Sequence, residues 1–273
     1  RNIPSCLITF DPNPFYILSQ KTTPINLQSL DAKLKTLEQI GLDKVLIIPF
    51  NKEFSLMSAQ VFADTILKDL FNPTLISVGT NHYFGHKKEG DLQFLKAFCS
   101  ENNIELHTPL MRKYKGSTIS SSLIRSLILD GDSRKVYDYL GRFYGFNATV
   151  VSGSKRGKTM NYPTANFIPI FKNQLLPSTG VYLTRVFLDG EIYFGMMNAG
   201  VRPTFDEKKF VMEVHILSDK FGSLYDKNFY IEFLHKIRDE KKFDNMELLI
   251  KQIEKDKEVF IELIDAFKEK YEI

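Results

Sequence analysis

The stretch GVYLTRVFLDGEIYFGMMNAG, residues Gly180–Gly200, decides the fold of the second half of the chain. β-branched and aromatic residues lie on both sides of Asp189-Gly190, with valine, tyrosine and phenylalanine before it and isoleucine, tyrosine and phenylalanine after it. An Asp-Gly pair between two such runs is a strong signal for a β-hairpin. Three further β-rich runs flank this hairpin: NATVVSG, KFVMEVHIL and KNFYIEFLHKI. Short strands separated by turn signals predict a small antiparallel β-barrel.

The chain after Phe243 has a helical rather than a strand period. Five apolar residues recur on one stripe: Met246, Leu249, Ile253, Phe260 and Ile264. We expect a C-terminal helix that packs on the barrel.

The first half alternates strands with helices. Three β-rich runs end in turn residues, CLITF, KVLIIPF and LISVG, and amphipathic stretches lie between them. Gly41 ends the first predicted helix and Ser58 is the expected N-cap of the second. This order predicts a Rossmann-like parallel sheet whose ligands sit beyond the carboxyl ends of the strands. Because the pattern changes after about Gly141, we expect two domains, residues 1–142 and 143–273.

Composition excludes several classes of protein. The 273 residues are 43% hydrophobic and 25% charged, and no apolar run approaches the roughly 20 residues that cross a bilayer. A net charge of +3 is too small to indicate nucleic-acid binding without a concentrated basic face. The first residues, RNIPSCLITF, do not form a secretory signal, so we expect a cytoplasmic protein. We also expect a monomer or weak oligomer. Cys6 and Cys99 form no CxxC pair, which argues against disulfides and thiolate zinc sites.

The segment GSKRGKTMNYPTAN, residues 153–166, has the chemistry of a phosphate site. Gly153 and Gly157 let the backbone approach a ligand closely, and Lys155, Arg156 and Lys158 supply positive charge beside exposed amides. This combination suits a polyphosphate such as that of ATP. An ordinary polar turn is the alternative, since the segment is neither a Walker loop nor a GxGxxG fingerprint.

Thr164 and Asn166 lie at the end of this segment and carry hard oxygen donors two residues apart. On an extended chain both side chains point to the same face. One or two protein oxygens completed by phosphate and water are what Mg²⁺ prefers, so these residues are the candidate metal ligands.

The same segment resembles the glycine-rich PTAN segment of riboflavin kinases, and further blocks follow in that family's order: LLPSTGVY, MNAGVRPTF, MEVHIL and IRDEKKF. The first half resembles the nucleotidyltransferase domain that bacteria fuse to this kinase, through TFDPNP, PFNKEFSLMSAQVFADTIL, VGTNHYFGHKKEGD and ISSSLIR. The resemblance implies a bifunctional riboflavin kinase/FMN adenylyltransferase. Such an enzyme converts riboflavin to FMN with ATP and Mg²⁺, and then FMN to FAD with a second ATP.

In the kinase half, the resemblance implies that Thr164 and Asn166 hold Mg²⁺ while the backbone from Gly153 to Gly157 cradles the phosphates of ATP. Glu213 matches the family's catalytic carboxylate, which acts as a base and takes the proton from the ribityl hydroxyl of riboflavin. A surface carboxylate on a strand is the alternative for Glu213.

Two more residues of this half match flavin-binding positions. Arg238 lies in the block that resembles a loop closing over flavin and nucleotide, although an ion pair with Asp239 or Glu240 would also explain it. Asn198 matches part of the flavin pocket, and a buried amide at a hairpin end is its alternative.

In the first half, Ser120, Ser121 and Ser122 precede an apolar helical run, so amides and hydroxyls at a helix N-terminus are available to phosphate. Arg125 lies one turn later and would reach the same anion. An N-cap alone would explain one of the serines.

Asn13 and Asn81 are the other candidate nucleotide or flavin ligands of this half. Asn81 follows a predicted strand end, and Asn13 lies in TFDPNP beside prolines that favour extended geometry. Turn formation is the alternative for Asn13.

One departure from the resemblance concerns adenylyl transfer. The related adenylyltransferases carry an HxGH motif ahead of the TFDPNP block, and none of the five histidines here stands in such a motif. We therefore expect a truncated or processed chain, or a degenerate domain, with adenylyl transfer impaired. The two alternatives to a bifunctional enzyme are a kinase with a vestigial front domain and a non-catalytic flavin or nucleotide sensor.

Overall fold

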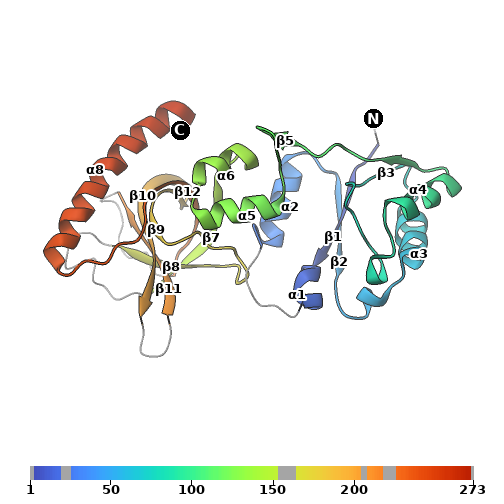
Figure 1. Ribbon diagram of the computed structural model, residues 1–273, viewed down its shortest axis with the longest axis horizontal. Helices are drawn as coiled ribbons and strands as arrows, with labels where there is room; N and C mark the ends of the chain where they lie inside the picture. The colour runs from blue at the N-terminus through green and yellow to red at the C-terminus, as the bar shows by residue number, and fades with distance from the viewer. Residues whose placement is uncertain (1–2, 20–25, 153–163, 204–207, 218–225, 272–273) are drawn as a thin grey trace. The chain divides into compact units, whose positions relative to one another are not determined.

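A computed structural model of the chain describes residues 3–19, 26–152, 164–203, 208–217 and 226–271 (Figure 1). These residues form two compact units. The first comprises residues 1–23 and 30–119, and the second comprises residues 24–29 and 120–273.

Parallel strand pairs and helices form the first unit. Its elements are, in order, β1 (Cys6–Asp11), α1 (Pro14–Ser19), α2 (Leu30–Gln39), β2 (Lys44–Pro49), η1 (Phe54–Leu56), α3 (Ala59–Phe62), η2 (Ala63–Phe71), β3 (Leu75–Ser77), η3 (His86–Lys88), α4 (Leu92–Glu101), β4 (Glu105–His107), β5 (Lys113–Tyr114) and β6 (Ser117–Thr118). β1 pairs in parallel with β2, and β3 pairs in parallel with β4. The predicted parallel α/β architecture is thus present, as two separate strand pairs among the described residues.

Local sequence explains where α3 begins. The hydroxyl of Ser58 accepts a hydrogen bond from the amide of Val61 at 3.2 Å, which confirms the predicted N-cap of α3. The helix then continues as the π-helical turns of η2. Ala63 on η2 packs with Phe98 and Cys99 of α4, so an apolar cluster holds the helices beside the β3–β4 pair.

A closed barrel of six antiparallel strands forms the core of the second unit, as predicted. Its strands are β7 (Tyr144–Val151), β8 (Ala165–Pro169), β9 (Gly180–Leu188), β10 (Glu191–Pro203), β11 (Lys208–Ile216) and β12 (Asn228–Arg238), joined in the order β10-β11-β8-β7-β12-β9. Asp189 and Gly190 form the hairpin turn between β9 and β10 with φ values of 53° and 85°. Positive φ at both turn positions is what a tight two-residue hairpin requires, and Asp-Gly provides it.

Two helices pack on the barrel unit, α5 (Ser121–Asp130) and α6 (Ser133–Leu140), both visible beside the barrel in Figure 1. Their apolar residues, including Ile124, Ile128 and Val136, join the same core cluster as the inward side chains of the strands. The main part of the second compact unit therefore starts at Ser120, earlier than the predicted boundary between residues 142 and 143. That boundary, as a division between two activities, stays a prediction.

A short segment from the first part of the chain also belongs to the barrel unit. Asn26 forms a parallel bridge with Gln174, whose side chain is 2% exposed and donates to the carbonyl of Leu27 at 3.0 Å. The same amide nitrogen of Gln174 donates to the hydroxyl of Tyr144 at 2.7 Å. This buried network attaches Asn26 and Leu27 to the barrel unit.

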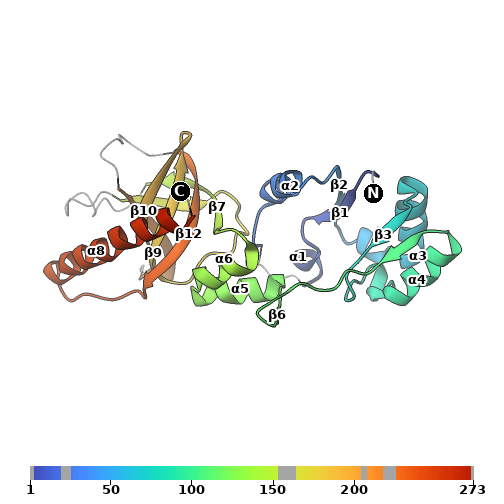
Figure 2. The same ribbon diagram turned by 90° about the horizontal axis from the view of Figure 1, so that it is seen from above.

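The predicted C-terminal helix is α8 (Met246–Tyr271), which lies along the outside of the barrel (Figure 2). Phe260 is fully buried and Ile264 nearly so, and both pack with Leu183 of β9 and Leu234 of β12. The end of the predicted apolar stripe that contains Phe260 and Ile264 is thus the part that packs on the barrel, whereas Met246, at the start of the stripe, is exposed. Within the described ranges, no helix is long and apolar enough to cross a membrane.

Candidate active site on the outer face of the barrel

Strand pairing brings three predicted site residues into one row. Asn166 of β8 lies directly opposite Glu213 of β11, and Glu213 lies opposite Asn198 of β10. Directly opposed Cα atoms in antiparallel strands are about 5 Å apart. The candidate metal ligand, the candidate base and the candidate flavin ligand are therefore neighbours on three adjacent strands.

These three side chains lie on the outer face of the barrel. Their neighbours along the strands are buried in the barrel core: Phe167, Met212, Val214, Met197 and Ala199. Because successive side chains of a strand point to opposite faces, Asn166, Glu213 and Asn198 point outward together. Asn198 is exposed, Glu213 is half-buried, and Asn166 is only 9% exposed. The expected alternation of Glu213 and His215 against Val214 and Ile216 is confirmed.

The donor chemistry at one end of this row fits a magnesium ion. Thr164 comes just before β8, is exposed, and stands two residues from Asn166. A hydroxyl and a carboxamide oxygen beside a carboxylate are hard donors of the kind Mg²⁺ takes. In the part of the chain that the structure describes, no group of three or more His, Cys, Asp or Glu could hold a metal ion. The predicted phosphate cradle, Gly153, Lys155 and Gly157, lies outside the described residues.

Arg238 lies in register with the same row but is engaged elsewhere. Asn198 is opposite Val181 of β9, and Val181 is opposite Arg238 of β12. The guanidinium of Arg238 binds Asp256 of α8 with nitrogen-to-oxygen distances of 2.9, 3.0 and 2.6 Å. The alternative of an ion pair between Arg238 and Asp239 or Glu240 is thus wrong, because the carboxylate that Arg238 binds is that of Asp256. The flavin role of Arg238 stays a prediction.

Sequence reasoning missed Asp256, although a signal was present. Asp256 stands three residues after Ile253 and four before Phe260, so it lies on the apolar stripe of α8. Its side chain is 5% exposed. A carboxylate on a buried stripe needs a cationic partner, and Arg238 is that partner.

Two candidate ligands of the front half lie beyond strand ends of the first unit. The side-chain oxygen of Asn13 accepts from the amide of Phe15 at 3.0 Å, just after β1, so it also shapes the start of α1. Asn81 is exposed in the turn that follows β3. Both positions agree with the expected ligand edge of a parallel sheet.

The other front-half candidates belong to the second unit. Ser120 is the N-cap of α5 and accepts from the amide of Leu123 at 3.2 Å, whereas Ser121 and Ser122 are exposed in the first turn. Arg125 follows one turn later and is half-buried. The serine used as a cap is thus Ser120, which leaves the hydroxyls of Ser121 and Ser122 at the surface.

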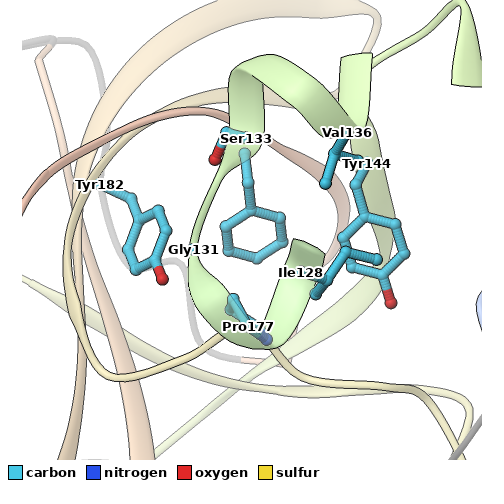
Figure 3. Close-up of a pocket in the computed structure, with 8 residues that line it drawn as sticks. Ile128, Gly131, Ser133, Val136, Tyr144, Pro177 and Tyr182 are labelled. Carbon is cyan, nitrogen blue, oxygen red and sulfur yellow. The ribbon is translucent and has the colours of Figure 1, made fainter. Parts of the chain in front are cut away.

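A small cavity lies in the barrel unit, under the corner between α5 and α6 (Figure 3). Tyr144 and Tyr182 lie on opposite sides of it, and Gly131 also lines it. The space admits about one water molecule. None of the predicted site residues lines it.

Comparison with known proteins relates the chain to one family over most of its length. A family model described as riboflavin kinase matches residues 140–264, and one described as FAD synthetase matches residues 1–123. The bifunctional riboflavin kinase/FMN adenylyltransferases of Pseudomonas fluorescens and Haemophilus influenzae are each 33% identical, over 90% and 94% of this chain and 78% and 83% of theirs. The corresponding protein of Escherichia coli K12 is 31% identical over 94% of this chain and 81% of its own.

A solved structure is also similar. It is described as a macrolide-efflux protein from Streptococcus pneumoniae, and it matches with a TM-score of 0.84 and 28% identity over 94% of this chain and 83% of that one. Two family models in series and relatives with both activities in their names agree with the two-part architecture. The chain belongs to the family of bifunctional riboflavin kinase/FMN adenylyltransferases.

Proposed function

We propose that the barrel transfers the terminal phosphoryl group of ATP to the ribityl hydroxyl of riboflavin, giving FMN and ADP. The observation that carries this proposal is the row formed by Asn166, Glu213 and Asn198 across β8, β11 and β10. Phosphoryl transfer depends mainly on positioning and on neutralising charge, and a row of this kind can orient both substrates.

Glu213 is the proposed general base. Its carboxylate accepts the proton of the ribityl hydroxyl as that oxygen bonds to the terminal phosphorus of ATP and the bond from phosphorus to the ADP oxygen breaks. Asn198, exposed on the next strand, binds the flavin, and Arg238 contributes from the end of β12.

Thr164 and Asn166 are the proposed magnesium ligands, and Gly153, Lys155 and Gly157 the proposed contacts to the phosphates of ATP. When bound, Mg²⁺ neutralises the charge that develops on the transferring phosphoryl group. Asn166 lies beside Glu213, so its carboxamide would hold the phosphate end of ATP next to the base.

For the front half we propose adenylylation of FMN to FAD in the intact protein, with Asn13, Asn81, Ser121, Ser122 and Arg125 as nucleotide or flavin ligands. Exposed serine hydroxyls in the first turn of α5 and amide side chains beyond two parallel strands support these assignments. We further propose that the enzyme acts in the cytoplasm on small-molecule substrates.

The kinase proposal is tested by incubating purified protein with riboflavin, ATP and Mg²⁺ and separating the flavins by chromatography. We expect FMN, and we expect Asn166→Ala to raise the Mg²⁺ concentration needed for half-maximal FMN formation about tenfold or more, because one metal ligand is lost. Ser122→Ala is the matched control, since Ser122 is assigned to the other activity, and it should leave FMN formation unchanged. Loss of FMN formation in both variants would contradict the assignment of Asn166 and Ser122 to two separate sites.

A further inference from the structure

Three consecutive charged residues at the end of β12 bind neighbouring parts of the barrel unit: Arg238, Asp239 and Glu240. Arg238 binds Asp256 of α8, and Asp239 binds Lys236 at 2.7 Å. The third residue, Glu240, reaches β10, where its Oε2 atom accepts a hydrogen bond from the amide of Val201 at 3.4 Å. The start of this loop is thus attached to α8, to β12 itself and to the strand that carries Asn198.

The carboxylate of Glu240 occupies the space where a side chain of residue 200 would be. A Cβ atom added to Gly200 would overlap the Oε1 atom of Glu240, and it would lie 3.4 Å from the Nδ2 atom of Asn198. The φ angle of Gly200 is not positive, so conformational freedom does not explain the glycine. Close approach of Glu240 does explain it.

Asn198 and Gly200 lie two residues apart on β10, so the Asn198 side chain and the Glu240 carboxylate share the outer face. The carboxylate therefore borders the row of Asn166, Glu213 and Asn198. It lies over Gly200 and at the amide of Val201, farther along β10 than Asn198.

We propose that Glu240 is a positioning residue of the kinase site. Docked on the backbone of Gly200 and Val201, its carboxylate limits the positions open to the Asn198 amide and fixes the first residues of the loop beside the flavin. A side chain at position 200 would push this carboxylate away from the Gly200 and Val201 backbone. The inference rests on the proposed phosphorylation of riboflavin and adds Glu240 and Gly200 to it.

The test measures steady-state kinetics of FMN formation for Glu240→Ala, Glu240→Gln, Gly200→Ala and the double variant. We expect Glu240→Ala to raise the KM for riboflavin about 3- to 10-fold, as for the loss of one hydrogen bond, with the KM for ATP changed less than about twofold. Glu240→Gln keeps an acceptor for the Val201 amide and should restore most of the affinity. Gly200→Ala should resemble Glu240→Ala.

The double variant distinguishes positioning from general damage. If Gly200→Ala acts by displacing Glu240, adding it to Glu240→Ala produces no further rise in the KM for riboflavin. Additive effects, or an unchanged KM in Glu240→Ala, would overturn the inference. Glu262→Ala, at an exposed carboxylate on α8, is the matched control, and Glu240→Ala keeps the test valid if Gly200→Ala fails to fold.

The two proposals fail in different ways. Wild-type protein that forms FMN, together with an unaffected Glu240→Ala variant, would contradict only the role of Glu240. Wild-type protein that binds riboflavin but forms no FMN would contradict the kinase proposal and, with it, the inference built on it.

Discussion

Replacing Asp256 by alanine should loosen α8 from the barrel and destabilise the second unit. Asp256 binds Arg238 through both carboxylate oxygens, at distances of 2.6 to 3.0 Å, and the Asp256 and Arg238 side chains are only 5% and 17% exposed. The alanine variant leaves the Arg238 guanidinium mostly buried with only the carbonyl of Asp239 as a described acceptor.

The size of the effect follows from this burial. Removing one partner of a fully buried ion pair costs about 3–5 kcal/mol, and the residual exposure of Arg238 reduces this to about 2–4 kcal/mol. For a domain of this size, 1 kcal/mol changes Tm by about 2–4 °C, so we expect a decrease of roughly 5–12 °C.

Differential scanning calorimetry measures the Tm, and hydrogen exchange of the α8 amides shows whether this helix is the element that loosens. Glu262→Ala, an exposed carboxylate on the same helix, should change neither. Replacing both partners, Arg238→Met with Asp256→Leu, should cost less than Asp256→Ala alone, because no unpaired charge remains. A Tm change in Asp256→Ala no larger than that of the control would refute this reasoning.

Further predictions concern protonation and thiol access. Burial lowers the pKa of His235 below its ordinary value of 6.5, so the folded state favours the neutral ring. The contribution of this neutral ring to stability is complete above pH 6.5 and is lost as the pH falls from there through the lower pKa of the folded state. Urea unfolding at pH 7.5 and 5.5 should therefore show a smaller loss of stability in His235→Gln than in wild type, and an equal loss would contradict the assignment. Cys6 is exposed, whereas Cys99 is buried and burial raises the pKa of its thiol. A thiol reagent should thus label Cys6 rapidly in native protein and Cys99 only after denaturation. Equal labelling rates of the two thiols under native conditions would contradict the burial of Cys99 on α4.

Much of the fold was predictable because its signals are local. The Asp189-Gly190 turn, the helical period of α8 and the N-cap at Ser58 depend on residues close together in sequence, and all three are confirmed, although Met246 of the predicted apolar stripe is exposed. The placement of α5 and α6 was not predictable in this way. An apolar helix face indicates burial but does not identify the sheet that covers it, and here the α5 and α6 side chains enter the barrel core.

Contacts between distant residues were also beyond local reasoning. The bridge between Asn26 and Gln174 joins residues 148 apart, and no periodic pattern marks either of them. The row of Asn166, Glu213 and Asn198 depends on strand register, which a single-residue shift would change. Only the family resemblance identified these residues as candidates, and the strand register of the structure shows that they are neighbours.

The most direct measurement is FMN formation by a Glu213→Gln variant, with riboflavin binding followed separately by flavin fluorescence. A glutamine keeps the size of the side chain but cannot accept the hydroxyl proton. We predict that riboflavin binding is retained and that kcat falls by about 10²–10⁴-fold, the usual contribution of a general base. A variant that keeps more than about a tenth of the wild-type kcat would show that Glu213 is not the base and that the row on the outer face of the barrel is not the kinase site.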